Sequence, residues 1–201
     1  LARGTAPLPP YIKRKNVAPP PVNDLERYQT VYARVPGSVA APTAGFHFTR
    51  PVLEALKRKG VTMTAVTLHV GYGTFLPIVA EEVERHRMEA GAYELTPEAA
   101  AEINAARRVV AVGTTATRVV ETLADKEGIV RPGTGETDLY IYPGYRFKRV
   151  NALLTNFHLP KSSLYLLASA FAGPSLLREA YGHAIRSGYR FYSYGDCTLI
   201  L

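Results

Sequence analysis

A run of polar side chains near the C-terminal end of the chain has residue types that can carry out acid–base chemistry. The run, residues 155–163, contains Asn156 and His158 and separates two apolar stretches. The first stretch, 152–154, predicts a short buried strand, and the second, 164–171, predicts a buried helix. The polar residues therefore fall where a strand passes into a helix, which is where α/β proteins tend to place their functional groups.

Three further polar clusters follow segments that we also predict as strands. If the sheet is parallel, all four clusters meet at one rim, and His47, His69 and His158 then occupy equivalent strand ends. We favour a shared catalytic role for these three histidines. A zinc site with three histidine ligands is an alternative, but the sequence has no His-x-His or His-x-x-x-His pair and no cysteine nearby. The three clusters are APTAGFHFT at 41–49, TLHVGYGTF at 67–75 and VGTT at 112–115.

Several residues of these clusters are candidates for binding a substrate. The pair Gly71 and Gly73 lets the backbone approach a ligand closely, although a dinucleotide fingerprint would need a third glycine. The turn at 113–115 offers amides and hydroxyls to an anion, and Arg118 can reinforce it. Ordinary capping of a helix would also explain this turn. The candidate binding residues are Thr43, Gly71, Gly73, Thr114, Thr115, Arg118, Tyr145 and Asn156.

Two aromatic segments complete the set of candidates. YRFYSYGD at 189–196 predicts an aromatic strand that ends in Asp196. This carboxylate could orient a ribose hydroxyl or take up a proton, whereas the simpler interpretation is an aspartate in a turn. YPGY at 142–145 predicts a turn, from which Tyr145 could reach the rim or stack on a base.

Predicted strands and helices alternate along the chain, and these elements must position the candidate residues. Such alternation predicts an α/β fold with a mostly parallel sheet, open or barrel-like, and with an incomplete barrel in this chain. Residues 1–23 contain six of the fifteen prolines and predict an extended connector, while 24–201 predict one α/β domain of catalytic type. Strands are predicted at 38–41, 61–70, 109–112, 138–142, 152–154 and 189–194, and helices at 24–33, 49–60, 96–108, 114–124, 162–172 and 175–187.

The overall composition limits the classes of protein that this chain can represent. Its net charge of +7 suits a polyanionic partner such as RNA, although a merely basic protein is an equal alternative. The single cysteine, Cys197, excludes a disulfide framework and makes a reducing, cytoplasmic location the expectation. No apolar run is as long as a membrane span, and the first ten residues lack the features of a signal peptide.

Nine motifs in this sequence closely resemble the S-adenosylmethionine:tRNA ribosyltransferase-isomerase family of queuosine biosynthesis. They occur in the same order and cover nearly the whole chain, which makes a chance match implausible. The motifs are PLPPYIKR at 7–14, ERYQTVYA at 26–33, APTAGFHFT at 41–49, TLHVGYGTF at 67–75, VAVGTTATR at 110–118, YPGYRFK at 142–148, TNFHLPKSSL at 155–164, SAFAG at 169–173 and YRFYSYGD at 189–196.

The resemblance implies a reaction that composition does not show. Family members transfer the ribosyl part of S-adenosylmethionine to 7-aminomethyl-7-deazaguanine in a tRNA anticodon and isomerise it to give epoxyqueuosine, releasing adenine and methionine. This chemistry needs a base, a proton donor for the departing adenine and groups that hold the ribose and the methionine carboxylate. His47, His69, His158 and Asp196 are the expected catalytic residues. We expect S-adenosylmethionine as substrate, no cofactor, tRNA as partner, no membrane and a monomer.

Two departures from the family pattern bear on this expectation. The family has an additional N-terminal portion before PLPPYIKR, so we expect this chain to be a fragment, a subset of ordered residues or a shortened relative. The family also usually shows His-x-Met-His-x-Glu where this chain has HRMEAG at 86–91, so that Glu89 and Gly91 replace a histidine and a glutamate. A non-catalytic relative that binds tRNA or a nucleoside is therefore the second hypothesis. A third is a metal-dependent sugar or nucleotide enzyme built on the three histidines.

Overall fold

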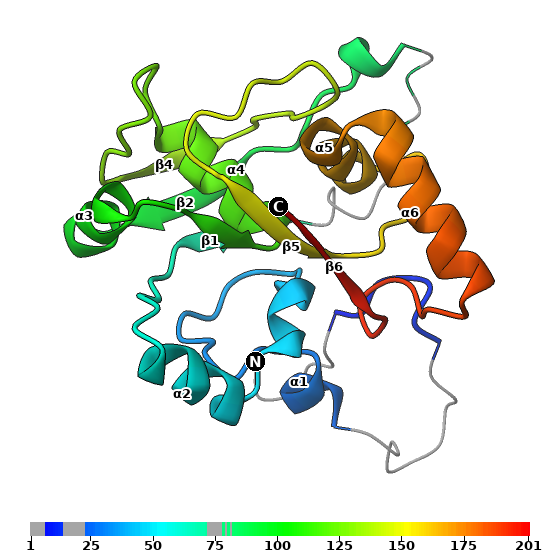
Figure 1. The fold of residues 1–201 in the computed structure, drawn as a ribbon, viewed down its shortest axis with the longest axis horizontal. Coiled ribbons are helices and arrows are strands. Elements are labelled where there is room, and N and C mark those ends of the chain that lie inside the picture. The colour runs from blue at the N-terminus through cyan, green and yellow to red at the C-terminus, as the bar shows by residue number, and fades with distance from the viewer. Residues whose placement is uncertain (1–6, 14–22, 72–77, 79, 81) are drawn as a thin grey trace.

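The structure is a computed structural model that describes residues 7–13, 23–71, 78, 80 and 82–201. The described residues form two three-stranded sheets with helices around them, which confirms a mixed α/β fold (Figure 1). One sheet has the order β1 (Thr67–His69), β2 (Gly91–Leu95) and β4 (Gly133–Thr137); the other has the order β3 (Val110–Val112), β5 (Ala152–Asn156) and β6 (Cys197–Ile200).

The predicted mostly parallel sheet is wrong, because β3–β5 is the single parallel pair among the described strands. The pairs β1–β2, β2–β4 and β5–β6 are antiparallel, and the described strands close no barrel. Sequence patterns missed β2 and β4, which contain glycine and expose several of their side chains, so that they lack the apolar runs of buried strands.

Five of the six predicted helices are found with bounds close to those expected, since their signals are local. The helix predicted at 24–33 is too long, because only Asp24–Arg27 are helical. Thr49, Thr96 and Ser162 each accept a hydrogen bond from a backbone N–H in the first turn that follows. Gly173, at a φ of 86°, ends one helix, and Pro174 begins the next. The helices are α1 (Asp24–Arg27), α2 (Arg50–Arg58), α3 (Pro97–Ala105), α4 (Thr114–Leu123), α5 (Ser163–Ala172) and α6 (Pro174–Arg186), with short 3₁₀ helices η1 (Thr43–His47) and η3 (Val83–Arg85).

Four predicted strands are wrong or too long. Residues 138–142 and 189–194 are not strands, and only 67–69 of the predicted 61–70 are one. Residues 38–41 form no strand either, although the N–H of Val39 donates to the carbonyl of Val70 at 3.0 Å. None of the helices in the described part of the chain has the length and apolar character that a membrane span requires.

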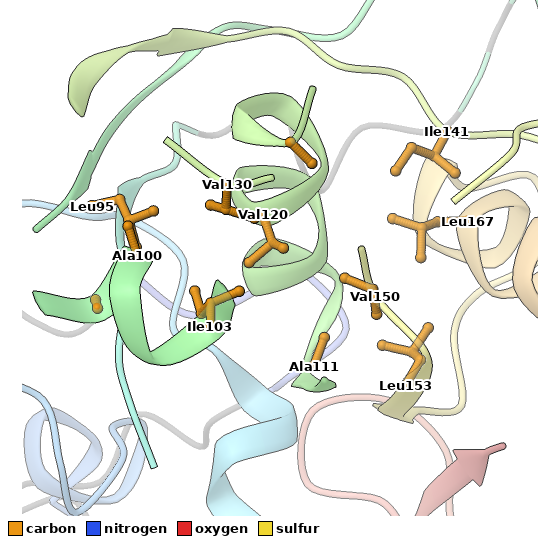
Figure 2. Close-up of a cluster of buried hydrophobic side chains, with 12 residues drawn as sticks. Leu95, Ala100, Ile103, Ala111, Val120, Val130, Ile141, Val150, Leu153 and Leu167 are labelled. Atoms are coloured by element: carbon orange, nitrogen blue, oxygen red, sulfur yellow. The ribbon is translucent and has the colours of Figure 1, made fainter. Parts of the chain in front are cut away.

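Helix α4 lies between the two sheets and contacts strands of both (Figure 1). Figure 2 shows Val120 of this helix in the middle of the main buried cluster, with Ile103 of α3 on one side and Leu153 of β5 on the other. Because α4 begins directly after β3, packing of its apolar face fixes where the β3–α4 junction lies. The cluster consists of Leu95, Ala99, Ala100, Ile103, Ala111, Val120, Ala124, Val130, Ile141, Val150, Leu153 and Leu167.

A fully buried carboxylate on α4, that of Glu121, binds the segment that leads into β5. Its oxygens accept hydrogen bonds from the backbone N–H groups of residues 148, 149 and 150, at 2.8, 2.9 and 2.9 Å. The Tyr145 hydroxyl donates to the same carboxylate at 3.1 Å. Since buried polar groups need partners, this one side chain provides the hydrogen-bond acceptors that the segment lacks.

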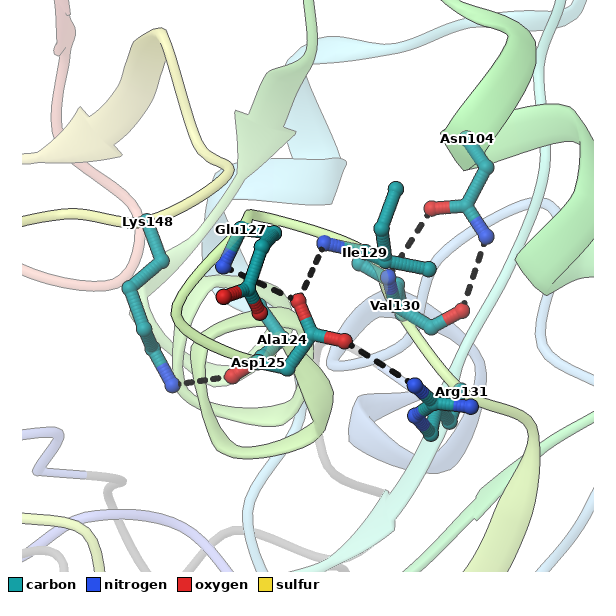
Figure 3. A network of polar contacts seen from close by, with 8 residues as sticks. All are labelled: Asn104, Ala124, Asp125, Glu127, Ile129, Val130, Arg131 and Lys148. Atoms are coloured by element: carbon teal, nitrogen blue, oxygen red, sulfur yellow. Dashed lines mark hydrogen bonds and ion pairs between the residues drawn. The ribbon is translucent and has the colours of Figure 1, made fainter.

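The neighbouring basic side chains tie the same segment to the ends of two helices. The Lys148 ammonium donates to the carbonyl of Ala124 at the end of α4 (Figure 3). The Arg149 guanidinium donates to carbonyls at the end of α3, including that of Ala106 at 2.8 Å. Cations at the C-terminal ends of helices satisfy free carbonyls and interact favourably with the helix dipole.

The loop after α4 is held by two side chains (Figure 3). The Asn104 amide donates to the carbonyl of Val130 at 2.8 Å and accepts from the N–H of Val130 at 2.9 Å. The Asp125 carboxylate accepts from the N–H groups of Glu127 and Ile129 and from the Arg131 guanidinium, at 3.1, 2.9 and 3.2 Å. These bonds, foremost that from the Ile129 N–H, hold the pKa of Asp125 below its ordinary value.

We expect the stabilising effect of the Asp125 carboxylate to depend on pH. A lowered folded-state pKa means that this stabilisation is present above the unfolded-state pKa, about 3.9, and is lost as the pH falls through the folded-state value. The free energy of unfolding of wild type should therefore exceed that of Asp125→Asn at neutral pH, and the gap should shrink by about pH 3. Denaturant titrations of both proteins at each pH measure this gap, and a constant gap would contradict the prediction.

Candidate functional site

The parallel β3–β5 pair brings three of the four predicted polar clusters to one edge. The N–H of Gly113, which directly follows β3, donates to the carbonyl of Leu154 in β5 at 2.8 Å. Gly113 has a φ of 90°, a conformation that favours glycine, and it lies beside Ala44 of η1. The start of α4, the end of β5 and the 3₁₀ helix η1 are therefore neighbours.

Asn156, at the end of β5, connects these segments through its amide. The side chain is 2% exposed. Its Oδ1 accepts from the Thr43 hydroxyl at 3.0 Å, and its Nδ2 lies 3.2 Å from Nε2 of His47. The same Nδ2 donates to the carbonyl of Tyr192 at 3.3 Å. Residues from three distant parts of the chain thus share one buried amide.

Residues 189–196, predicted as a strand, form a tight turn instead. Tyr192 has a φ of 69°, which is rare for a residue other than glycine. Its N–H donates to the carbonyl of Phe157 at 3.0 Å, and its carbonyl also accepts from the N–H of Gly195 at 3.0 Å. Alternating aromatic residues suggested a strand, but their rings pack locally: Phe157 and Phe191 have ring centroids 4.9 Å apart. The turn places Asp196 at the start of β6.

Gly195 is required by the close approach of backbone in this turn. A Cβ at this position would lie 2.4 Å from the carbonyl oxygens of Arg190 and Phe191, and backbone atoms cannot move aside as a flexible side chain can. We expect Gly195→Ala to open the turn, displace Asp196 and lower the free energy of unfolding by about 1–3 kcal/mol.

Denaturant titration measures this loss, and Gly133→Ala is a matched control. Gly133 begins β4, its φ lies outside the left-handed region, and a Cβ at this position would meet no atom within 4 Å. A Gly195→Ala protein no less stable than Gly133→Ala would show that the steric contact does not matter.

A pocket of about 370 Å³ opens next to this cluster, and His47 and Asp196 both line it. Burial lowers the pKa of His47, while the nearby Asp196 opposes that shift and Arg190 adds to it. The Asp196 carboxylate accepts from the backbone N–H and the guanidinium of Arg190 at 2.7 and 3.1 Å. These bonds, first that from the N–H, lower the pKa of Asp196. The pocket therefore combines a neutral imidazole with an ionised carboxylate at neutral pH.

Most other residues of the pocket were not among the predicted site residues. They come from the motifs ERYQTVYA, APTAGFHFT and YRFYSYGD, which carried the resemblance but had no chemistry assigned to them beyond His47 and Asp196. Packing explains one motif: a Cβ on Gly45 of η1 would lie 2.0 Å from the Tyr32 hydroxyl, so glycine at this position lets the Tyr32 side chain lie against η1. The remaining lining residues are Arg27, Gln29, Thr30, Val31, Phe46, Phe48, Arg190, Ser193, Tyr194 and Gly195.

The N-terminal segment 7–13 lies against the turn that carries Asp196. The Tyr11 hydroxyl is 2.6 Å from the Ser193 hydroxyl, and the Tyr11 and Tyr192 rings have centroids 5.0 Å apart. The buried Tyr28 hydroxyl is 3.0 Å from the same Ser193 oxygen. This part of the predicted connector therefore packs on the domain beside the pocket.

His158 follows Asn156 by two residues, but its hydrogen bonds are made with other residues than those of the Asn156 cluster. Its Nε2 lies 2.7 Å from the Thr155 hydroxyl, and its backbone N–H donates to the Tyr181 hydroxyl at 2.8 Å. Burial lowers the pKa of His158 to about 4, so the ring is neutral at physiological pH. Among the described residues, His158 does not line the pocket of His47.

His69 lies at the end of β1, in the antiparallel sheet, and not on the rim shared by β3 and β5. A Cβ on Gly37 would lie 3.0 Å from the His69 ring, and the His69 Nδ1 is buried with no hydrogen-bond partner in the described part of the chain. The prediction that the three histidines share one rim is therefore wrong, because it required a parallel sheet.

The residues that depart from the family pattern lie beside β1. A Cβ on Gly71 would lie 2.9 Å from Oε2 of Glu89, so this carboxylate lies against the Gly71 backbone. A Cβ on Gly91 would lie 2.9 Å from the backbone oxygen of His69. Glycine at position 91 therefore allows β2 to pair closely with β1. Gly73, the second glycine of the predicted ligand turn, lies outside the described residues.

The other predicted binding residues divide between the rim and the interior. Thr114 is buried in the first turn of α4, and Thr115 follows it, half-buried. Arg118 is 6% exposed, and its guanidinium donates to the carbonyls of Leu139 and Thr137 at 3.0 and 3.1 Å. Burial lowers its pKa, against the opposing effect of Asp138. Arg118 thus holds residues 137–139 against α4.

Tyr145 was a candidate to reach the rim or stack on a base, but its hydroxyl faces the buried carboxylate of Glu121. Burial, and then the negative charge of Glu121, raise the pKa of Tyr145. Its ring packs on Phe147 with centroids 5.1 Å apart. A zinc site built on three histidines also finds no support, since the His, Cys, Asp and Glu side chains of the described residues form no group of three that could hold a metal ion.

Comparisons with known proteins match this chain over almost its whole length. A family model described as queuosine biosynthesis protein matches residues 1–200. The S-adenosylmethionine:tRNA ribosyltransferase-isomerase of Syntrophus aciditrophicus is 59% identical over 198 residues, which are 98% of this chain and 55% of that protein. The Moorella thermoacetica protein of the same name is 54% identical, with 98% of this chain and 57% of that protein covered.

A solved structure supports the same relationship. The crystal structure of S-adenosylmethionine tRNA ribosyltransferase from Thermotoga maritima matches with a TM-score of 0.65 and 42% identity, over 79% of this chain and 51% of that one. This chain spans about half the length of the relatives that it matches. It belongs to the queuosine biosynthesis protein family, together with relatives that are named S-adenosylmethionine:tRNA ribosyltransferase-isomerases.

Proposed function

We propose that this chain carries a catalytic part of an S-adenosylmethionine:tRNA ribosyltransferase-isomerase. The reaction moves the ribosyl moiety of S-adenosylmethionine to 7-aminomethyl-7-deazaguanine in tRNA, gives epoxyqueuosine, and releases adenine and methionine. The observation that carries the proposal is the buried Asn156 amide, which joins Thr43, His47 and the turn of Asp196 next to one pocket. Three motifs that match the family meet there.

The roles that we propose follow from this arrangement. His47 and Asp196 contact the reacting part of S-adenosylmethionine, because they line the pocket and differ in charge. The first turn of α4, with Thr114 and Thr115, lies at the same rim and offers amides and hydroxyls to the methionine carboxylate. The reaction needs a nucleoside-sized cavity, and the volume of about 370 Å³ falls within the range of small-molecule sites.

We assign three of the other predicted residues to support of this site. Arg118 and Tyr145 hold the segments beside α4, and His158 stabilises the turn after β5, since their polar groups are already engaged. The net charge of +7 suits the tRNA substrate. We also propose that β3–β5–β6 belongs to a larger, barrel-like sheet, because β3 and β6 each have one edge that no described strand covers.

Release of adenine tests this proposal. Protein carrying this chain is incubated with S-adenosylmethionine and tRNA that contains 7-aminomethyl-7-deazaguanine, and free adenine is measured by chromatography. We expect adenine only when the modified tRNA is present, with unmodified tRNA as the matched control. Binding of tRNA without adenine release would instead favour a non-catalytic relative. Glu89→His and Gly91→Glu, which restore the residues of the family pattern, would then be the first variants to test.

A further inference from the structure

We propose that Asn156 is a positioning residue that fixes His47 as a neutral imidazole with its proton on Nδ1. His47 is then a hydrogen-bond donor toward the pocket and not the base that removes a proton from substrate. The tautomer follows from the hydrogen bonds alone, whereas the donor role rests on the function proposed above.

The first step is the orientation of the Asn156 amide. One end of the amide lies 3.3 Å from the carbonyl oxygen of Tyr192, and the other lies 3.0 Å from the Thr43 hydroxyl. A hydroxyl can donate or accept, but a carbonyl can only accept. The nitrogen must therefore face Tyr192, because the reverse orientation would place the buried Asn156 oxygen against the Tyr192 carbonyl oxygen with no proton between them.

The position of the Tyr192 carbonyl is itself well determined. The Tyr192 N–H donates to the carbonyl of Phe157, directly after Asn156, and the N–H of Gly195 donates to the Tyr192 carbonyl. The left-handed conformation of Tyr192 turns that carbonyl toward β5. The turn thus decides which way the amide points.

The second step passes from the amide to the imidazole. Nδ2 of Asn156 carries only donor hydrogens, and it lies 3.2 Å from Nε2 of His47. Nε2 must therefore accept, which leaves it without a proton, and a neutral imidazole with a bare Nε2 carries its proton on Nδ1. The charged groups that act on His47, Asp196 and Arg190, have opposite effects on its pKa, and burial favours the neutral ring.

The third step concerns what such a histidine can do. The lone pair of Nε2 is occupied by Asn156, and Nδ1 has a proton to share, so the ring offers the pocket a donor and no free base. A neutral imidazole used as an electrophile is an established catalytic device. In the proposed reaction, this donor would stabilise charge that develops on the part of S-adenosylmethionine bound next to it.

Nitrogen-15 NMR of labelled protein tests the tautomer without any substrate. The His47 signals are assigned from their loss in His47→Ala. We expect a protonated Nδ1 and an unprotonated Nε2 in wild type at neutral pH. A proton on Nε2 in wild type would overturn the inference, and this readout comes from the wild-type protein itself, with a folded His47→Ala variant needed only to assign the signals.

Two variants test whether Asn156 fixes the tautomer of His47 or only stabilises the fold around it. Asn156→Asp replaces the donor with a carboxylate, which should move the proton to Nε2 and raise the pKa of His47 by about one unit or more. Thr43→Val removes the hydroxyl but keeps the Tyr192 carbonyl, so the wild-type tautomer should persist. An unchanged tautomer and pKa in Asn156→Asp would contradict the proposal.

The donor role has its own readout in adenine release. The amide nitrogen of asparagine at position 47 can take the place of Nδ1, so His47→Asn should release adenine about tenfold faster than His47→Ala. If His47 were the base, both variants would be equally impaired. Equal rates together with the expected NMR result would reject the donor role and leave the tautomer established. No adenine release from wild type would reject the proposed function instead.

Discussion

Replacing His47 with alanine is expected to lower the rate of adenine release by about 100- to 1,000-fold, the usual effect of removing one oriented donor from an active site. His47 lines the pocket, and its ring is held by the buried amide of Asn156. A donor fixed in this way needs no reorganisation during the reaction. The substrate should still bind, so the loss should appear in kcat more than in KM.

The matched control is His183→Ala. His183 is an exposed histidine on α6 that lines a different pocket, and we expect its variant to keep wild-type turnover. Circular dichroism and denaturant titration establish that both variants are folded. If folded His47→Ala turned over within about twofold of wild type, His47 would have no part in the reaction.

The second large effect is expected for stability, at Glu121. Glu121→Ala should lower the free energy of unfolding by at least about 3 kcal/mol, because each buried polar group left without a partner costs about 1–3 kcal/mol. Three backbone N–H groups, of residues 148–150, and the Tyr145 hydroxyl would lose their acceptor. Glu121→Gln should also be destabilising, since its amide nitrogen would face backbone donors.

Denaturant titration measures this effect, with Glu127→Ala as the matched control. Glu127 is an exposed glutamate in the loop that follows α4, so its loss should change the free energy of unfolding by less than about 0.5 kcal/mol. The segment that Glu121 holds leads directly into β5 and Asn156. If Glu121→Ala were as stable as Glu127→Ala, the prediction would be wrong, and the backbone donors would have found other acceptors, such as water, at no cost in the free energy of unfolding.

The elements that sequence patterns predicted well are those whose signals are local. Thr49, Thr96 and Ser162 cap helices within three residues of themselves, and the observed hydrogen bonds follow the predicted spacing. The apolar runs that became β3 and β5 were also found, whereas the parallel direction of their pairing is seen only in the structure. The parallel pair is the reason that Asn156 and the start of α4 lie at one rim.

The elements that were missed depend on distant partners. Strands β2 and β4 contain glycine and exposed residues, and they become strands because they pair with each other and with β1. The turn at 189–196 has the composition of a strand, yet Gly195 allows a backbone approach that no other residue tolerates. As a result, His69 lies in the other sheet and not on the predicted rim, and Asp196 lines the same pocket as His47.

The amino-acid sequence by itself determined the family, the bounds of five of the six helices and the identity of the residues able to do chemistry, since these depend on local propensity, apolar periodicity and motif order. The tertiary structure alone decided which of those residues meet. Arg118 and Tyr145 face the interior because residues 137–150 need partners there, and His47 faces Asn156 because η1 packs on the end of β5. Contacts between residues more than a hundred positions apart follow from how the elements pack, and no local pattern encodes them.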